Sequence, residues 1–436
     1  MAEISPFHGM HYSPEKVDID RVVGPPYDVL GPDEQDALYA ASPFNFVRVM
    51  LNRPEHGDGE SSSPYTRAAA FLNEWLASGI LVEDPEPALY LYRQEFTNPA
   101  DGHRYTRSGL FCAIKLEPYE AGVVLPHEET RTKAKEDRLR LMRATSANPE
   151  PIFGLYEDEQ GELGALYDRI AQDKPMLEAH SGGDSHRVWR AADPGAISHA
   201  QRFLAPRQVW IADGHHRYET GLTYRDERRK SAPPTQRPDD PTARPYDYLL
   251  IVLTAFTDPG IVVLPTHRLV RNVPGSRIAE LYLQLERYFD IEPVHPQDLD
   301  TRMKGDPSAG VHRFGVFMRD KAWILTLRDP SVMDAAVEGH ADCWKQLDVS
   351  ILQALVLERS LGIPAASLAT TPDIGYTRDR DDAIERVNSG EYQIALLLNL
   401  PSADEVRQVA AAGDKMPPKS TFFYPKLWSG LLLRRV

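Results

Sequence analysis

The segment Val209–Thr220 constrains the fold of this chain more than any other. It opens with an apolar run, Val209–Ile211, which predicts a short buried strand. Asp213 and Gly214 then turn the chain, and a polar, helix-forming sequence follows to about Lys230. A strand that passes through a glycine into a helix leaves backbone N–H groups at the helix start, which suit an anion. The segment therefore predicts either an anion site or, with Asp213 as N-cap, an ordinary capped helix.

Polar residues gather in the first turn of this predicted helix, as an Asp, two His, an Arg and a Glu between positions 213 and 219. The planar fork of donors on an arginine matches phosphate oxygens. We therefore expect phosphate binding by five consecutive residues: Asp213, Gly214, His215, His216 and Arg217. We also expect the substitution Arg217→Ala to leave the fold intact and to weaken anion binding.

Composition narrows the class of protein. The 436 residues are enough for two or three domains, and the net charge of −15 argues against non-specific binding of nucleic acid. The two cysteines cannot build a disulfide framework or a cysteine zinc site. The first residues do not resemble a signal peptide, and no apolar run approaches the roughly 18 residues of a membrane-spanning helix. We expect a cytoplasmic protein with a small-molecule substrate and neither a nucleic-acid nor a membrane partner.

Strand and helix patterns follow each other without a strict β-α-β rhythm, which indicates an α+β fold with mixed sheets. Residues 88–96 and 104–116 predict a β-hairpin, because a turn-forming sequence separates two apolar, β-branched runs. The proline-rich stretch 231–246 predicts a surface loop or lid. We predict a phosphate-binding domain over 1–270, and a second, smaller α/β domain over 271–436 that closes the site.

A carboxylate on a stiff loop is a first candidate for catalysis outside the glycine turn. Asp28 follows Pro25 and Pro26, and each proline fixes its own backbone and restricts the residue before it. Catalytic carboxylates need fixed placement, so Asp28 could act as a general base or a metal ligand. The alternative is a rigid surface turn without a chemical role.

The sequence from Pro126 to Arg138 begins like a zinc-protease motif. The second histidine that the motif requires is replaced by Arg131, so we expect no tightly bound zinc. The polar residues of this stretch either line a pocket or form a solvated helix with paired charges. The pocket interpretation names His127, Glu128, Thr130, Lys133 and Arg138 as contacts of substrate or phosphate.

A basic, hydroxyl-bearing turn lies near the C-terminus, where Lys419, Ser420 and Thr421 follow two prolines. It lacks the spacing of a phosphate-binding Walker loop, yet these side chains could contact a phosphate or a carboxylate. We expect the segment Lys415–Lys426 to close over the pocket of the glycine turn, with Lys419 pointing into it. The alternative is a tail whose aromatic residues dock in a core while its lysines face water.

Four stretches of the chain together resemble a bacterial family catalogued as a domain of unknown function, number 1015. They are Gly24–Val29, His127–Thr130 with Lys133, Lys135, Asp137 and Arg138, the turn Asp213–Arg217, and Met416–Leu427. The Asp-Gly-His-His-Arg turn by itself resembles the phosphate-binding turn of the ParB/sulfiredoxin-like fold, which includes the free serine kinases. This narrower resemblance implies a ParB/sulfiredoxin-like core in the first domain.

The same resemblance implies a phosphotransferase that acts on a small hydroxyl compound, with free L-serine as the acceptor. The donor would be a nucleotide or a diphosphate, together with Mg²⁺. The catalytic candidates are Asp28, Glu128 and His216, with one of the two carboxylates as the base. The catalytic glutamate of the serine kinases has no counterpart here that matches residue by residue. Two alternatives stay open, a non-catalytic protein that senses a nucleotide and a hydrolase that releases phosphate.

Overall fold

The computed structural model describes residues 2–59, 62–231, 244–319, 321–368 and 371–436. Most of the predicted proline-rich loop, residues 232–243, lies outside these ranges. The chain divides into two compact units. The first unit comprises Met1–Pro126, Thr130–Val262 and Pro425–Val436, and the second comprises His127–Glu129 and Val263–Tyr424.

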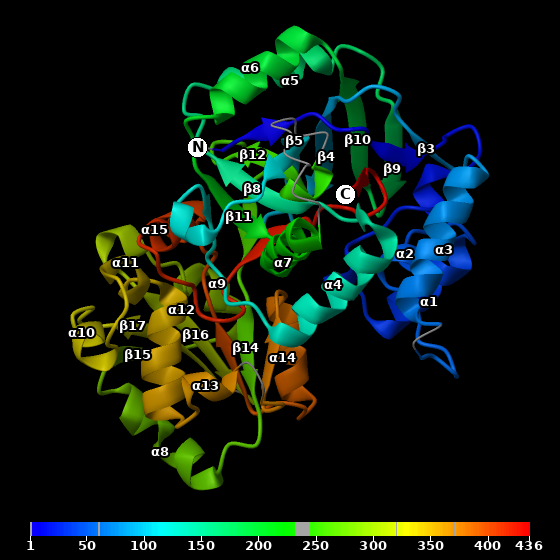
Figure 1. The fold of residues 1–436 in the computed structure, drawn as a ribbon. Helices are drawn as coiled ribbons and strands as arrows, with labels where there is room; N and C mark the ends of the chain where they lie inside the picture. Colours follow the sequence, from blue (N-terminus) through cyan, green and yellow to red (C-terminus); the bar gives the residue numbers. More distant parts are fainter. Residues whose placement is uncertain (1, 60–61, 232–243, 320, 369–370) are drawn as a thin grey trace. The chain divides into compact units, whose positions relative to one another are not determined.

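A nine-stranded mixed sheet forms the centre of the first unit (Figure 1). Its strands lie in the order β6 (Val124–Leu125), β11 (Val209–Asp213), β8 (Ile152–Tyr156), β12 (Tyr248–Ala255), β5 (Arg104–Lys115), β4 (Leu89–Thr97), β10 (Asp184–Ala191) and β9 (Leu177–Ser181), and β1 (Ile4–Ser5) pairs with β5. The β11–β6 and β12–β8 pairs are parallel, and the other described pairs are antiparallel. The antiparallel pairing of β4 with β5 confirms the predicted hairpin.

Helices and two small sheets complete the first unit. The helices are α1 (Pro32–Ala41), α2 (Val47–Met50), α3 (Pro64–Ala77), α4 (Thr132–Thr145), α5 (Glu162–Ile170), α6 (Pro194–Leu204) and α7 (His215–Ser231), with short turns η1 (Ile19–Arg21), η2 (Tyr27–Val29), η3 (Tyr119–Ala121) and η5 (Pro245–Asp247). The small sheets pair β2 (Met10–Tyr12) with β3 (Leu81–Glu83) and β7 (Ala147–Asn148) with β21 (Arg434–Arg435).

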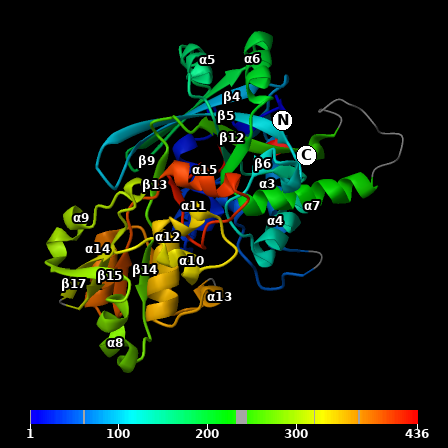
Figure 2. The same ribbon diagram turned by 90° about the vertical axis from the view of Figure 1, so that its left-hand side faces the viewer.

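The core of the first unit follows from the alternation of side chains along the strands. Leu110, Cys112 and Ile114 share one face of β5, because successive side chains point to opposite faces of a sheet. They belong to one apolar cluster with side chains of α5, α6 and α7. Helix α4 packs along α7 (Figure 2). The start of α7 is therefore held between the sheet and α4.

An antiparallel six-stranded sheet forms the centre of the second unit. Its strands lie in the order β15 (Phe289–Val294), β17 (Lys321–Leu327), β16 (Arg313–Met318), β19 (Ile394–Leu397), β14 (His267–Val270) and β18 (Ile374–Thr377), and β13 (Val262–Leu264) pairs separately with β20 (Phe422–Tyr424). The helices are α8 (Gly275–Leu285), α9 (Leu299–Arg302), α10 (Val332–Ala336), α11 (Asp342–Lys345), α12 (Asp348–Ile351), α13 (Ala365–Leu368), α14 (Arg380–Asn388) and α15 (Ala403–Ala411), with the π-helical η8 (Leu352–Ser360) and the turns η6 (Pro296–Asp298) and η7 (Pro307–Ala309).

The second unit has its own apolar cluster, in which Leu269, Ile324 and Leu397 of the sheet pack with Ala383 and Val387 of α14.

The chain is thus an α+β protein with mixed and antiparallel sheets, as the sequence predicts. None of the helices within the described residues has the length and apolarity needed to cross a membrane.

Candidate anion site at the start of helix α7

The turn between β11 and α7 requires a glycine. Gly214 has a φ of +95°, in the region that favours glycine over residues with a Cβ. A Cβ at this position would also lie 2.8 Å from Cγ2 of Ile152. Helix geometry leaves the first N–H groups of α7 without partners inside the helix, at the positive end of its dipole. The strand–glycine–helix turn that the sequence predicts is therefore present, with Gly214 between β11 and α7.

Two cations hold the carboxylate that precedes this turn. The Arg217 guanidinium donates to Oδ2 of Asp213 over 2.6 Å and also to the carbonyl of Pro151. Nζ of Lys426 contacts the other carboxylate oxygen of Asp213. Burial opposes ionisation of Asp213, but Lys426 and Arg217 outweigh it and lower the pKa of this carboxyl group. The three side chains form a buried, ionised network that fixes the turn.

This network changes what we expect of Arg217. Its side chain is buried, with the residue only 8% exposed, and its guanidinium is bonded to Asp213 and to a backbone carbonyl. Burial lowers the tendency of Arg217 to hold its proton, but Asp213 and Glu150 outweigh burial and raise its pKa. Arg217 therefore stabilises the turn itself, and its removal cannot be expected to leave the fold intact.

Two buried side chains of the sheet position Lys426. Arg107 donates to the carbonyl of Pro425 over 2.6 Å, and Nε2 of Gln94 donates to the carbonyl of Lys426 over 3.1 Å. These two hydrogen bonds fix the backbone of Pro425 and Lys426, and the side chain of Lys426 contacts Asp213 from there. The sequence indicated a C-terminal segment at the site but did not single out Lys426, because the two partners lie 213 positions apart and carry no local signal.

The start of α4 contributes a second set of contacts. Thr130 Oγ1 and Lys135 Nζ both donate to Oε2 of Glu219, over 2.7 and 2.8 Å. The backbone N–H of Arg131 donates to Nε2 of His216 over 2.8 Å. Glu219 belongs to the polar cluster of the sequence, but the local pattern does not indicate its partners on α4. Its place one helical turn after His216 was the available signal, because residues three apart share a helix face.

His216 is neutral near pH 7. Burial lowers its pKa, with Glu219 opposing the shift and Arg131 adding to it. Because Nε2 accepts a hydrogen bond from Arg131, the proton of the neutral ring resides on Nδ1. His216 can therefore donate one hydrogen bond to a ligand without carrying a charge.

Asp28 lies near the start of α7. It is exposed on η2, and its negative charge raises the pKa of both His216 and Arg217, although burial is the largest influence on each. The neighbouring Tyr27 stacks under Arg138, whose guanidinium carbon lies 3.9 Å from the centre of the ring. Residues expected at the site from distant parts of the chain, among them Asp28, Arg138 and His216, thus belong to one region of the first unit.

The other predicted contacts lie elsewhere. Lys133 is exposed on α4, in the first unit. Glu128 belongs to the second unit, as do His127 and Thr421, where Nε2 of His127 lies 3.1 Å from Oγ1 of Thr421.

The basic turn near the C-terminus is also in the second unit. Ser420 is buried and donates to the carbonyl of Pro417, while Lys419 is exposed with a φ of +60°. That Lys419 reaches the glycine turn stays a prediction. In the described part of the chain, no group of three or more His, Cys, Asp or Glu side chains is arranged to hold a metal ion.

Comparison with known proteins places the chain in a family. No curated protein matches it. Among solved structures, a free serine kinase in complex with AMP is similar over 72% of this chain and 86% of its own, at 12% identity and a TM-score of 0.35. A conserved hypothetical protein from Pyrococcus furiosus is similar over 73% and 93%, at 13% identity and a TM-score of 0.33.

A third structure, SbnI with a C-terminal truncation from Staphylococcus aureus, is similar over 73% of this chain and 85% of its own, at 11% identity and a TM-score of 0.32. TM-scores at this level support no conclusion about the site or its chemistry. A sequence model of a protein family, by contrast, matches residues 4–350 of this chain, which is more than half of its length. The chain therefore belongs to the family described as "Protein of unknown function (DUF1015)".

Proposed function

We propose that the first unit is a small-molecule kinase that holds the phosphate of a donor at the start of α7. The observation that carries this proposal is the strand–glycine–helix turn, where Gly214 has a φ of +95° and the carboxylate before it is neutralised by Arg217 and Lys426. A phosphate at a helix start gains both N–H donors and the favourable helix dipole. Donor and acceptor follow from the resemblance of the turn, as a nucleotide or diphosphate and free L-serine.

The residues divide the work of this proposed reaction. The backbone N–H groups of His215 and His216 would donate hydrogen bonds to phosphate oxygens, and Nδ1–H of the neutral His216 would add a further donor. Asp213 and Arg217 would hold these donors in place. Preorganised donors of this kind stabilise the charge that develops on a transferring phosphoryl group.

Asp28 is the proposed general base. Its carboxylate is exposed on a loop stiffened by Pro25 and Pro26, and its charge acts on His216 and Arg217. It would take the proton of the acceptor hydroxyl as that oxygen bonds to the phosphorus and the P–O bond to the rest of the donor breaks, with the remaining donor leaving on its own oxygen. Glu128 ranks second because it belongs to the other unit.

A magnesium ion fits this proposal in one respect. Mg²⁺ usually binds through one or two carboxylates together with substrate phosphates and water, so a cluster of protein ligands is not required. The carboxylates of Asp213 and Glu219 are already engaged by cations, so the ion would be held mainly by the donor phosphates and by water. When bound, the ion would neutralise charge on the donor phosphates.

A donor and acceptor screen tests the proposed activity. The full chain would be incubated with ATP, ADP or pyrophosphate and Mg²⁺, with L-serine in one arm and L-alanine, which has no hydroxyl group, in the other. Phosphorus NMR is expected to show phosphoserine in the serine arm with at least one donor and no phosphorylated product in the alanine arm.

The other outcomes separate the alternative functions. Donor consumption at the same rate in both arms would identify a hydrolase that releases phosphate. Donor binding without turnover would identify a protein that senses a nucleotide. Neither binding nor turnover of any donor would contradict the anion site itself.

A further inference from the structure

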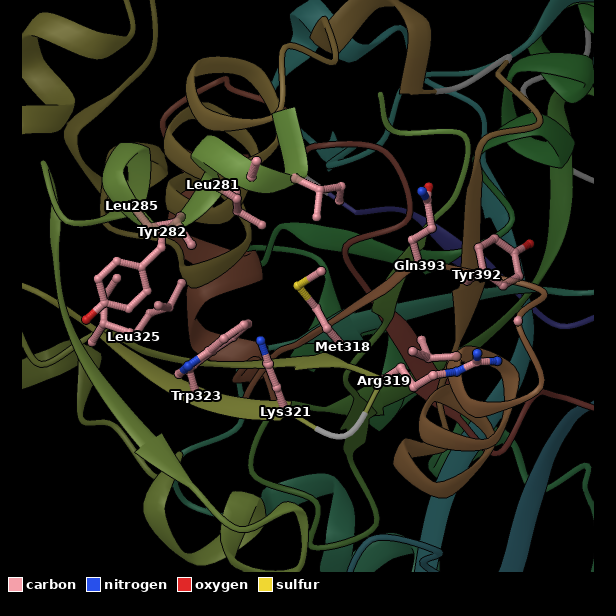
Figure 3. Close-up of a pocket in the computed structure, with 15 residues that line it drawn as sticks. Leu281, Tyr282, Leu285, Met318, Arg319, Lys321, Trp323, Leu325, Tyr392 and Gln393 are labelled. Carbon is pink, nitrogen blue, oxygen red and sulfur yellow. The ribbon is translucent and has the colours of Figure 1, made fainter. Parts of the chain in front are cut away.

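Helix α8 of the second unit presents an apolar stripe to a cavity. Ile278, Leu281, Tyr282 and Leu285 recur at the spacing of one helix face. Leu281 and Leu285 are buried, Ile278 is half-buried, and all four side chains line a pocket. Figure 3 shows Leu281, Tyr282 and Leu285 along its α8 wall. Tyr282 is 45% exposed, so the pocket is open to solvent on this side.

The opposite wall of this α8 pocket is one face of the sheet. Lys321, Trp323 and Leu325 alternate along β17 and therefore share that face. Met318 pairs with Lys321 across the β16–β17 ladder, and Ile291 pairs with Leu325 across β15–β17. Both partners also line the pocket.

The size of the α8 pocket suits a small molecule. Its volume is about 740 Å³, within the range of roughly 300–1,000 Å³ that is typical of small-molecule sites. Most of the residues that line this open hollow are apolar, so it fits a ligand with an apolar body.

The polar groups of the pocket indicate the charge of that occupant. The Gln393 side chain is engaged by both backbone groups of Val273, and Arg319 donates to the carbonyl of Asn388 over 3.1 Å. Lys321 instead extends beside Trp323 and Met318, with its ammonium group directed toward α8 (Figure 3). The charged residues that line the pocket within the described chain are two cations, Arg319 and Lys321, and this local positive charge favours an anionic group on the ligand.

We propose that the α8 pocket binds a small amphipathic anion. Its apolar body would lie between α8 and the Trp323 face of the sheet, and its single carboxylate would pair with Lys321. This binding site is separate from the proposed phosphate site and does not depend on it.

Titration calorimetry with decanoate on the full chain tests this binding. Decanoate is expected to bind one per chain with a Kd of about 0.1 mM or below, given the usual affinity of well-placed small ligands. Propionate should bind at least about a hundredfold more weakly, because it lacks most of the apolar body. Decyltrimethylammonium, which has a chain of the same length and the opposite charge, should bind roughly tenfold more weakly or worse.

Two variants and a control locate the site. Lys321→Met should weaken decanoate binding roughly tenfold, by loss of a charge-assisted contact. Ala279→Trp, at an exposed position that lines the pocket, should weaken it by a similar factor or more by filling the space. Lys304→Met, at an exposed position of the same unit outside the pocket, should leave it unchanged. Circular dichroism would verify that each variant is folded.

The proposal is overturned by any of three results. These are the absence of saturable decanoate binding, equal binding of the cationic amphiphile, and decanoate binding that Lys321→Met and Ala279→Trp leave unchanged in folded protein.

Discussion

Replacing Arg217 with alanine is expected to lower the free energy of unfolding by about 1.5–3 kcal/mol, the usual contribution of a hydrogen bond to a charged group. The substitution removes a hydrogen bond of 2.6 Å to Asp213 and another to the Pro151 carbonyl. It leaves Asp213 buried with Lys426 as its remaining cationic partner in this network. Urea unfolding measures the loss, and hydrogen exchange should locate it in β11 and α7.

The matched control is Arg228→Ala, at an exposed position on the same helix, which should change stability by about 0.5 kcal/mol or less. A loss below about 1 kcal/mol for Arg217→Ala would show that the ion network does not hold the turn.

The Arg217→Ala variant should also have a weaker dependence of stability on pH. Because the pKa of Asp213 is lowered to about 2 in the folded chain, its contribution is fully present above the unfolded pKa near 4 and is lost as the pH falls through the folded pKa.

Replacing Asp28 with asparagine is expected to lower kcat for phosphoryl transfer by about 10²–10⁴, the usual contribution of a general base. Asparagine keeps the shape of the side chain but cannot accept the hydroxyl proton at neutral pH. Because the phosphate would be held by the start of α7, the affinity for the donor should change much less. Steady-state kinetics of phosphoserine formation and calorimetric titration with the donor measure the two effects separately.

Asp33→Asn is the control for this second substitution, since Asp33 is also exposed and lies five positions further along the chain, on α1. It should leave kcat within about twofold, as expected for a surface substitution away from the site. A value of kcat for Asp28→Asn close to that of the unaltered chain would exclude Asp28 as the base. The carboxylate to test next would then be Glu128.

The local part of this site could be predicted from the sequence. An apolar run, a glycine and a polar helix-forming stretch predict a strand that feeds a helix, and the structure has β11, Gly214 and α7 in that order. The same kind of signal predicted the β4–β5 hairpin, because turn residues separate two β-branched runs. Such patterns act over a few residues, so one sequence is enough to show them.

The contacts that hold the site together could not be predicted in this way. Asp213 contacts Lys426, and Arg107 and Gln94 hold the backbone of Pro425 and Lys426 at that place. A pairing over such a separation depends on the order of the strands, which the local pattern does not determine. A boundary drawn along the sequence likewise cannot show that Pro425–Val436 returns to the first unit.

The role of Arg217 illustrates a second limit of sequence patterns. An arginine in the first turn of a glycine-started helix suits phosphate and suits an internal carboxylate equally well. Its burial and the distance to Asp213 decide between these uses, and both depend on how β8 and α7 pack. The backbone N–H groups and His216 are consequently the stronger candidates for direct contact with an anion.

The location of a bound phosphate tests the central claim most directly. A crystal structure of the full chain grown with Mg²⁺ and a non-hydrolysable ATP analogue would show it. Our account predicts phosphate oxygens at hydrogen-bond distance, about 3 Å, from the backbone nitrogens of His215 and His216, with the Asp213–Arg217 pair intact behind them. Phosphates bound elsewhere on the chain, with no anion at the start of α7, would contradict it.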